Sequence, residues 1–275
     1  MRLKERIGID VGRRLRIEDA ILWAAAHGVR ILDIELDRGE NALCAIDSAR
    51  ALAIRKSLEA HGIRLGLHTL SAVNIAEYSP FVREATDRYL AAYVDAASML
   101  GARWVVVHAG YHFGSDKELR MAAGLERLQR AAEYAEKKKV LLLLENLNKE
   151  PAAAEVHYLA HTIEEWRYYF LKIASPALGL AFTVNHAHLV PAGVAGFVDA
   201  LEMARVVEVR LADCRRGGDE VHLPPGKGDL DFADMFKRVE GKGFTGHYMN
   251  AFGTLDEMLE GREALVALAA RAGIG

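Results

Sequence analysis

The sequence predicts an α/β protein folded as a single closed (β/α)8 TIM barrel that spans residues 1–275. Eight short apolar runs alternate with eight longer amphipathic stretches from one end of the chain to the other. No Pro- or Gly-rich linker divides the chain into halves. One motif recurs, in which a glycine ends a helix and the next strand begins. Its glycines lie at positions 28, 62 and 101, and this spacing leaves room for one strand and one helix per repeat.

The eight predicted strands are short, and several of them are apolar almost throughout. Val140–Glu145, for example, is apolar up to its last residue. Strands of a parallel sheet have this composition because both of their faces are buried. In chain order we expect strands at Arg6–Val11, Arg30–Leu36, Arg64–Thr69, Trp104–His108, Val140–Glu145, Leu178–Thr183, Val206–Leu211 and His247–Ala251.

Helices are expected between and after these strands, and two of them carry clear start signals. Ser79 precedes Pro80, and proline is favoured at the first helical position. Thr162 is followed three residues later by Glu165, which is the pattern of a capping box. In chain order we expect helices at Ile17–Ala26, Ile46–Ala60, Pro80–Leu100, Lys117–Lys138, Thr162–Ile173, Phe197–Met203, Phe232–Lys242 and Leu255–Ala272.

A doubly wound open sheet is the alternative architecture. Such sheets usually have about five to seven strands and carry a glycine-rich nucleotide loop. Neither G-x-G-x-x-G nor G-x-x-x-x-G-K-[ST] occurs in the chain. The closed barrel is therefore the favoured prediction.

Composition argues against several classes of function. The formal net charge of −3 provides no excess of basic residues for a nucleic-acid partner. No apolar run approaches the length of about 18 residues that a membrane span requires, and the first residues lack the apolar core of a signal peptide. Two cysteines are too few for a disulfide framework. We therefore expect a cytoplasmic protein with a small-molecule partner, no nucleic acid and no membrane.

Polar residues follow the predicted strands at the end where (β/α)8 barrels carry their sites. Histidines come from four strands or post-strand loops, and a glutamate comes from a fifth. A single histidine at a strand end is more often structural, but the convergence of several on one rim predicts a functional site. The candidates are His68, His108, Glu145, Thr183, His186, Arg210, Glu220, His222 and Asn250, with Tyr111 and Lys149 on neighbouring loops.

The chain resembles the xylose isomerase-like barrel superfamily, which includes ketose 3-epimerases, hydroxypyruvate isomerase, inosose dehydratases and, more distantly, endonuclease IV. Four segments carry the resemblance. They are His108-Ala109-Gly110, Leu144-Glu145-Asn146, His186-Ala187-His188-Leu189, and the stretch 222–232 with its Pro-Pro-Gly-Lys-Gly sequence. The resemblance implies a sugar-like substrate and leaves a homo-oligomer possible, since family barrels often pair through their outer helices.

The family's sugar isomerases hold one divalent metal with Glu, Asp, His and Glu, and the resemblance places these ligands on Glu145, Thr183, Arg210 and Asn250. Only the first ligand is present. Arginine cannot ligate a cation, because it stays protonated and has no free lone pair. We therefore expect a site that works without a metal or other cofactor, in which Arg210 holds an oxyanion or a substrate carboxylate.

Metal binding is the alternative. The resemblance to endonuclease IV implies two further ligand sets, and imidazole and carboxylate suit zinc. The sets are His68, His108 and Glu145, and His186, Glu220 and His222. They would hold Zn, Mn or Co.

The resemblance thus implies an isomerase, epimerase or dehydratase that enolises a small polyhydroxylated carbonyl compound. Glu145 is the expected base, Arg210 holds the oxyanion, and His186 and His108 are the acids. Epimerisation by two carboxylates is disfavoured because Asn250 replaces the second glutamate. The expected substrate contacts are His68, Asn250, His222, Lys149, Tyr111 and Thr183. The alternatives are a non-catalytic ligand-binding barrel and a metal-dependent hydrolase.

Overall fold

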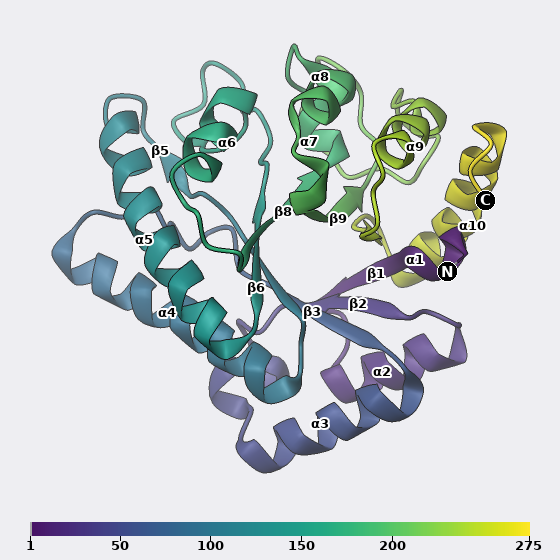
Figure 1. The fold of residues 1–275 in the computed structure, drawn as a ribbon, viewed down its shortest axis with the longest axis horizontal. Helices are drawn as coiled ribbons and strands as arrows, with labels where there is room; N and C mark the ends of the chain where they lie inside the picture. The colour runs from purple at the N-terminus through teal and green to yellow at the C-terminus, as the bar shows by residue number, and fades with distance from the viewer. Residues whose placement is uncertain (1) are drawn as a thin grey trace.

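The computed structural model describes residues 2–275 and is built around a closed barrel of parallel strands (Figure 1). Neighbouring strands run in parallel, and the last strand closes on the first with Tyr248 opposite Ile7. The predicted fold class is therefore confirmed. The barrel strands are β1 (Ile7–Gly12), β2 (Ile31–Ile34), β3 (Arg64–His68), β4 (Trp104–Val107), β6 (Leu141–Glu145), β8 (Leu178–Thr183), β9 (Val206–Leu211) and β10 (His247–Asn250).

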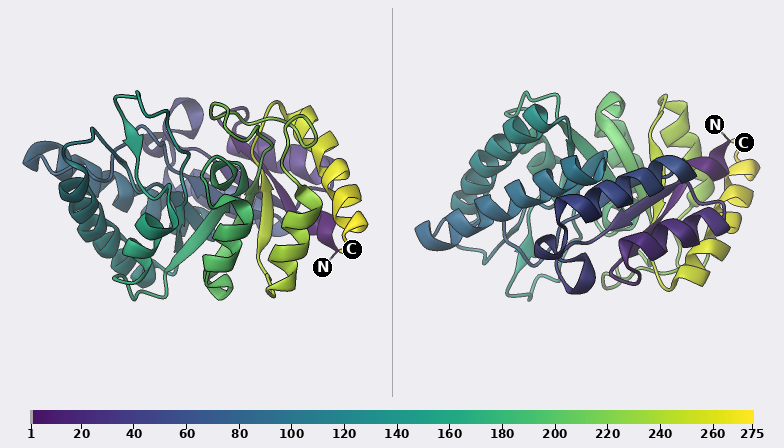
Figure 2. Two further views of the ribbon diagram at one scale, coloured as in Figure 1. Left: turned by 90° about the horizontal axis from the view of Figure 1, so that it is seen from above. Right: turned by 90° about the horizontal axis from the view of Figure 1, so that it is seen from below.

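Helices surround the barrel, as the two views of Figure 2 show. In α5, for example, Leu128, Ala132 and Ala135 recur at helical spacing and are buried, so this face packs towards the strands. The principal helices are α2 (Ile17–Ala26), α3 (Ser48–His61), α4 (Pro80–Leu100), α5 (Lys117–Lys138), α6 (Ile163–Phe170), α8 (Gly193–Ala200), α9 (Phe232–Gly241) and α10 (Leu255–Arg271).

A second, smaller apolar cluster is separate from the large core that contains the buried helix faces. Its members come from five of the barrel strands, and we call it the barrel plug. Trp104 fits because Gly66 lies beside it: a Cβ on that glycine would come within 2.1 Å of the indole. The barrel plug consists of Ile31, Trp104, Val106, Leu143, Ala181 and Met249.

Predicted and observed bounds agree for several of the elements and differ by a few residues in the others. Strands β8 and β9 and helices α2, α4 and α5 have the predicted bounds, and the other strands differ by one or two residues at an end. The helix expected at Phe197–Met203 instead occupies Gly193–Ala200, because Leu201 is extended and ends it. The helix expected at Thr162–Ile173 begins after Thr162, whose hydroxyl accepts from the Glu165 amide and so caps it.

Several short elements were not predicted. α7 (Val184–His188) directly follows β8, and a two-stranded antiparallel pair, β5 (Tyr111–His112) and β7 (His157–Tyr158), joins two loops. The remaining short elements are α1 (Leu3–Arg6), η1 (Gly39–Asn41), η2 (Leu43–Ala45) and η3 (Met203–Arg205).

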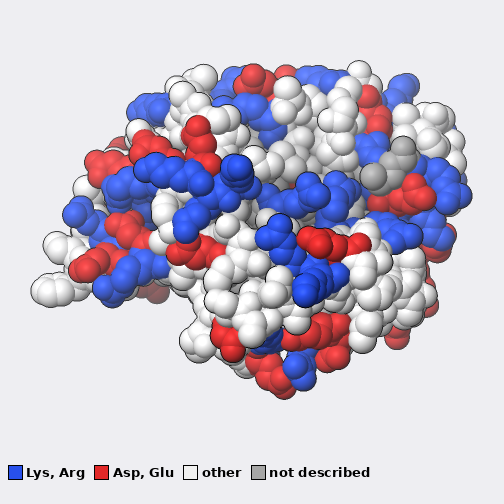
Figure 3. Space-filling model, turned by 60° about the horizontal axis from the view of Figure 1, so that its bottom comes forward, with Lys and Arg blue, Asp and Glu red and all other residues white. Residues whose placement is uncertain are grey.

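Surface composition adds two observations. Within residues 2–275, no helix has both the length and the apolar composition that crossing a bilayer requires. Lys and Arg side chains form a band across the face drawn in Figure 3.

Candidate active site

A cavity of about 680 Å³ opens at the carboxyl ends of the barrel strands, where barrels of this type carry their sites. Its walls are mainly charged and polar. Most of the candidates expected from the sequence line it: His68, His108, Glu145, His186, Arg210, Glu220 and His222. The end-of-strand rule therefore predicted a group of residues that share one cavity.

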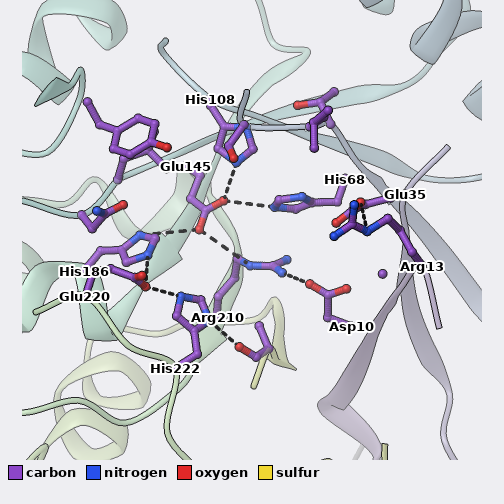
Figure 4. A pocket seen from close by; sticks show the side chains of 18 of the residues that line it. Asp10, Arg13, Glu35, His68, His108, Glu145, His186, Arg210, Glu220 and His222 are labelled. Atoms are coloured by element: carbon purple, nitrogen blue, oxygen red, sulfur yellow. Dashed lines mark hydrogen bonds and ion pairs between the residues drawn. The ribbon is translucent and has the colours of Figure 1, made fainter. Parts of the chain in front are cut away.

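Glu145 lies at the centre of this group (Figure 4). One carboxylate oxygen, Oε2, lies 3.2 Å from His68 Nε2 and 3.3 Å from His108 Nε2. The other, Oε1, accepts a hydrogen bond of 2.5 Å from the Thr183 hydroxyl. Burial opposes ionisation, but the two imidazoles and the charge of Arg210 hold the pKa of Glu145 well below its usual range. Glu145 is therefore a buried, ionised carboxylate with two histidines on one oxygen.

The His68–His108–Glu145 triad has the chemistry and spacing of a metal site. Its three candidate ligand atoms lie within 4.8 Å of one another. Zinc with tetrahedral ligands about 2.1 Å away keeps those ligands about 3.4 Å apart, which is close to the 3.2 and 3.3 Å found here. Imidazole nitrogen and carboxylate oxygen also suit manganese and cobalt. These residues fit a divalent cation.

A second triad is formed by His186 in α7 with Glu220 and His222 from the segment after β9. Glu220 Oε1 lies 2.6 Å from His222 Nε2 and 3.6 Å from His186 Nε2. The Nδ1 atoms of both histidines contact main-chain carbonyls, of Asn146 at 2.8 Å and Ala251 at 2.6 Å. Because each Nδ1 is occupied by a carbonyl, Nε2 is the ring nitrogen that faces Glu220; it donates to that carboxylate here and, once deprotonated, could bind a metal.

The ionic surroundings of Glu220 and His222 agree with this geometry. Hydrogen bonds from His186 and His222 hold the pKa of Glu220 far below its usual range. Burial opposes protonation of His222, but the neighbouring Glu220 carboxylate outweighs it and raises the pKa of the imidazole. The second triad is thus a charged cluster that opens into the same cavity as the first.

Arg210 lies on β9 beneath the cavity and is only 3% exposed. Its Nη1 donates to Asp33 and to Glu208, both at 2.7 Å, while Nη2 pairs with Asp10 and Nε lies 3.8 Å from Glu145. Both terminal nitrogens are therefore occupied by carboxylates of the protein. This arrangement does not fit the expectation that Arg210 grips a substrate carboxylate with two parallel hydrogen bonds.

The same carboxylates remove the support for a metal-free site. Asp10, Glu145 and Glu208 bring three carboxylates to one guanidinium. Asp33 is the fourth carboxyl group; burial, reinforced by the nearby Glu208, raises its pKa well above the usual value. The guanidinium charge is already balanced, and the negative surroundings favour a further cation rather than replace one.

Four expected substrate contacts do not line the cavity. Asn250 is fully buried and donates to the Met258 carbonyl at 2.9 Å, and Thr183 is buried behind Glu145, which it orients. Lys149 is exposed outside the cavity. Tyr111 lies on β5, edge-on to Tyr158, and it is Tyr158 that lines the cavity. These four residues lie outside the cavity lining because a residue near a strand end can point into a helix layer or away from the mouth.

Sequence reasoning also missed several residues of the cavity and its floor. Asp10 and Glu35 lie at the carboxyl ends of β1 and β2, so the rule that found the histidines could have found them as well. Asp33 and Glu208 lie inside strands, and only their distance to Arg210 shows their role. No local sequence signal links residues that are so far apart in the chain.

Glu35 lines the cavity and contacts no histidine. Its Oε2 lies 3.2 Å from Arg13 Nε and has no partner of hydrogen-bond geometry among residues 2–275. Burial raises the pKa of Glu35 above its ordinary value. A carboxyl group in a cavity with a raised pKa is suited to proton transfer near neutral pH.

The fold and the site define the class of protein: a (β/α)8 barrel with a histidine- and carboxylate-rich cavity at the carboxyl ends of its strands. The chain belongs to the family described as the xylose isomerase-like TIM barrel, whose model matches residues 21–267. The resemblance inferred from the sequence is therefore confirmed.

Several relatives show what the chain is similar to. A protein of Methanoculleus marisnigri named probable endonuclease 4 is 28% identical over 182 residues, which cover 62% of this chain and 63% of the relative. The match thus spans less than two thirds of that relative's length. Among solved structures, a D-tagatose 3-epimerase-like protein superposes with a TM-score of 0.83 at 20% identity, covering 98% of both chains.

Two further epimerase structures share the fold. D-psicose 3-epimerase from Clostridium cellulolyticum H10, solved with D-tagatose, has a TM-score of 0.77 at 15% identity, and 98% of each chain is covered. 3-Keto-D-glucoside 4-epimerase from E. coli has a TM-score of 0.73 at 14% identity, with 96% of this chain and 99% of that chain covered. At these identities the likeness concerns the fold.

Proposed function

We propose that the protein is a metal-dependent isomerase, epimerase or lyase that enolises a small polyhydroxylated carbonyl compound. The observation that carries this proposal is the His68–His108–Glu145 triad, which opens into a cavity that also contains Glu35, a carboxyl group free of histidine contacts. The cavity volume of about 680 Å³ suits a small molecule. The sugar epimerases that share the fold support the substrate class.

His68, His108 and Glu145 would hold the divalent cation. When bound, the cation would polarise the carbonyl oxygen of the substrate. Thr183 holds Glu145 in place through its hydroxyl, and Arg210 supports the same carboxylate from below. In this proposal Glu145 is a ligand rather than the base expected from the sequence, because two histidines already occupy its outer oxygen.

Glu35 would take the proton next to the carbonyl. Figure 4 shows Glu35 and His186 on opposite sides of Glu145, so a substrate between them has a proton acceptor on one side and a candidate acid on the other. Abstraction by one base and donation by a separate acid serve isomerisation or loss of water. Arg13, beside Glu35, stabilises the carboxylate once it is ionised.

A metal-dependent hydrolase is the second candidate, and the second triad favours it. Because His186 and His222 both present Nε2 to Glu220, the cavity has a second place for a cation, and paired cations are typical of hydrolytic sites. The name of the Methanoculleus relative is consistent with this candidate.

One experiment separates these functions. The protein is purified without an affinity tag, its metal content is measured, and it is incubated in D2O with sugars and sugar acids while NMR follows deuterium uptake. Our proposal predicts about one zinc, manganese or cobalt per chain at the first triad and metal-dependent exchange next to a carbonyl. Glu145→Gln should lose that metal and the exchange, whereas the control Glu118→Gln on the exposed side of α5 should keep both.

Three outcomes would contradict the proposal. Exchange that persists in metal-free protein would exclude the metal role. Cleavage of an ester or phosphodiester without exchange would favour the hydrolase. Binding of a compound with neither exchange nor conversion would favour the ligand-holding barrel.

A further inference from the structure

The amino-terminal end of the barrel carries arginines at regular positions. Arg6, Arg30 and Arg103 each stand directly before a strand, namely β1, β2 and β4, and Arg64 is the first residue of β3. Since these strands are parallel neighbours, their first residues lie side by side. The helix–glycine–strand repeat thus produces a row of guanidinium groups at the end of the barrel opposite the candidate active site.

A second cavity, of about 740 Å³, opens at this end. It lies between the starts of β3, β4 and β6 and the ends of α3, α4 and α5, and it is separate from the cavity described above. Its basic lining residues are Arg55, Arg64, Arg103, Lys138 and Lys139, and its acidic lining residue is Glu59. We call it the basal cavity.

Two arginines of the basal cavity have no partner in the described part of the chain. Among residues 2–275, no hydrogen bond or ion pair reaches the guanidinium of Arg64 or Arg103, whereas Arg6 pairs with Glu240 at 3.0 Å and Arg30 donates to the His61 carbonyl at 2.7 Å. Arg55 pairs with Glu59, so the acidic residue in the lining is already used.

The positive charges of Arg64 and Arg103 are not balanced by a nearby carboxylate or explained by a helix dipole. Burial lowers the pKa of Arg64, and the neighbouring Arg103 and Arg6 lower it further, with no carboxylate acting in the opposite direction. Basic residues in the last turn of a helix, such as Lys138, are explained by the helix dipole. Arg64 and Arg103 lie at strand starts, outside those turns, so the dipole does not account for them.

We propose that the basal cavity binds a small polyanion with at least two phosphate groups. Guanidinium groups bind phosphate oxygens through paired hydrogen bonds, and two adjacent free guanidiniums suit two linked phosphates better than one. The volume of the cavity is that of a site for a metabolite-sized ligand. The net charge of −3 and the concave shape favour a small ligand over a nucleic acid.

The test is isothermal titration calorimetry of the full chain with inorganic pyrophosphate at low ionic strength. We expect saturable 1:1 binding that is at least about tenfold tighter than that of inorganic phosphate. Arg64→Gln with Arg103→Gln should weaken pyrophosphate binding at least about tenfold. The matched control, Arg88→Gln with Arg271→Gln, removes two exposed arginines elsewhere on the surface and should leave it unchanged.

Further variants establish where the pyrophosphate binds. Glu145→Gln with His186→Ala should retain pyrophosphate binding, because those residues lie at the other end of the barrel; loss of binding in this variant would assign the pyrophosphate to the candidate active site. Circular dichroism and melting of each variant establish that it is folded. Where the double variant does not fold, Arg64→Gln alone is used.

No saturable binding, or binding unaffected by the loss of Arg64 and Arg103, would overturn the proposal. Tighter binding of a single-stranded oligonucleotide through the same arginines would replace it with a nucleic-acid surface.

Discussion

Arg210 is the residue whose surroundings differ most from what the sequence suggested. Its guanidinium contacts Asp10, Asp33 and Glu208 and is withdrawn from solvent. Removal of one partner from a buried ionic cluster leaves the others uncompensated, and this costs more than the intact cluster contributes to stability.

Replacement of Arg210 by methionine should therefore destabilise the protein by about 3–5 kcal/mol. Urea unfolding at pH 7 measures the loss. The double variant Arg210→Met with Asp33→Asn should recover part of it, because one of the unpaired acids is removed. A single variant as stable as the native protein would show that the cluster is not held by this cation.

Glu35 sets an expected pH dependence for the proposed reaction. A base must be deprotonated, and burial raises the pKa of Glu35. The value of kcat/KM should therefore rise with pH through a midpoint above 4.5 and then level off. Glu35→Gln should abolish most of the activity, and Glu35→Asp should keep the pH profile with a lower rate. A native profile in Glu35→Gln would assign the base elsewhere.

At the level of single residues, the sequence predicted the histidines and Glu145 because each follows a recognisable strand. It could not predict that the free groups of Arg210 are occupied, since Asp10 and Asp33 reach it only through the closure of the barrel. The distinction between a metal-free site and a metal site depends on this contact.

Between elements, Glu165 connects α6 to the start of α5. Its carboxylate lies 2.5 Å from Lys117 Nζ and 3.1 Å from His161 Nδ1. Burial opposes ionisation, but His161 and Lys117 outweigh it and lower the pKa of Glu165 to about 2. A carboxyl whose pKa is lower in the folded state stabilises the fold above its unfolded pKa, and this stabilisation is lost as the pH falls towards the folded pKa.

Glu165→Gln should therefore destabilise the protein at pH 7 by up to about 3 kcal/mol. Between pH 5 and pH 3 the native protein should lose stability faster than this variant, and the difference between them should shrink. Urea unfolding at several pH values measures both effects, with exposed Glu164→Gln as the control. Parallel pH curves for native protein and Glu165→Gln would contradict the role assigned to this carboxylate.

Element prediction succeeded or failed according to length. α4 and α5 are long enough for their apolar periodicity and their end signals to agree, and both have the predicted bounds. α7, β5 and β7 have five, two and two residues, which is too short for any periodicity. α7 nevertheless carries His186, so the feature that the sequence could not resolve is one that shapes the site.

For the molecule as a whole, the closed topology followed from the number of strands and the repeat, while the chemistry at its two ends followed from neither. One end gathers carboxylates and histidines, and the other gathers arginines, of which Arg64 and Arg103 have no partner among the described residues. Because side chains alternate between the two faces of a strand, the sequence indicates which residues face inwards. Only closure of the barrel determines which of these side chains contact one another.

The barrel plug has a kinetic consequence for the whole molecule. Trp104, Met249 and their neighbours fill the barrel interior with apolar side chains, so the cavity at the carboxyl ends has no passage through to the opposite end. In the proposed function, substrate and product would therefore enter and leave by the same mouth. Product should therefore inhibit competitively against substrate, and initial rates measured with added product would reveal a mixed pattern if a second exit existed.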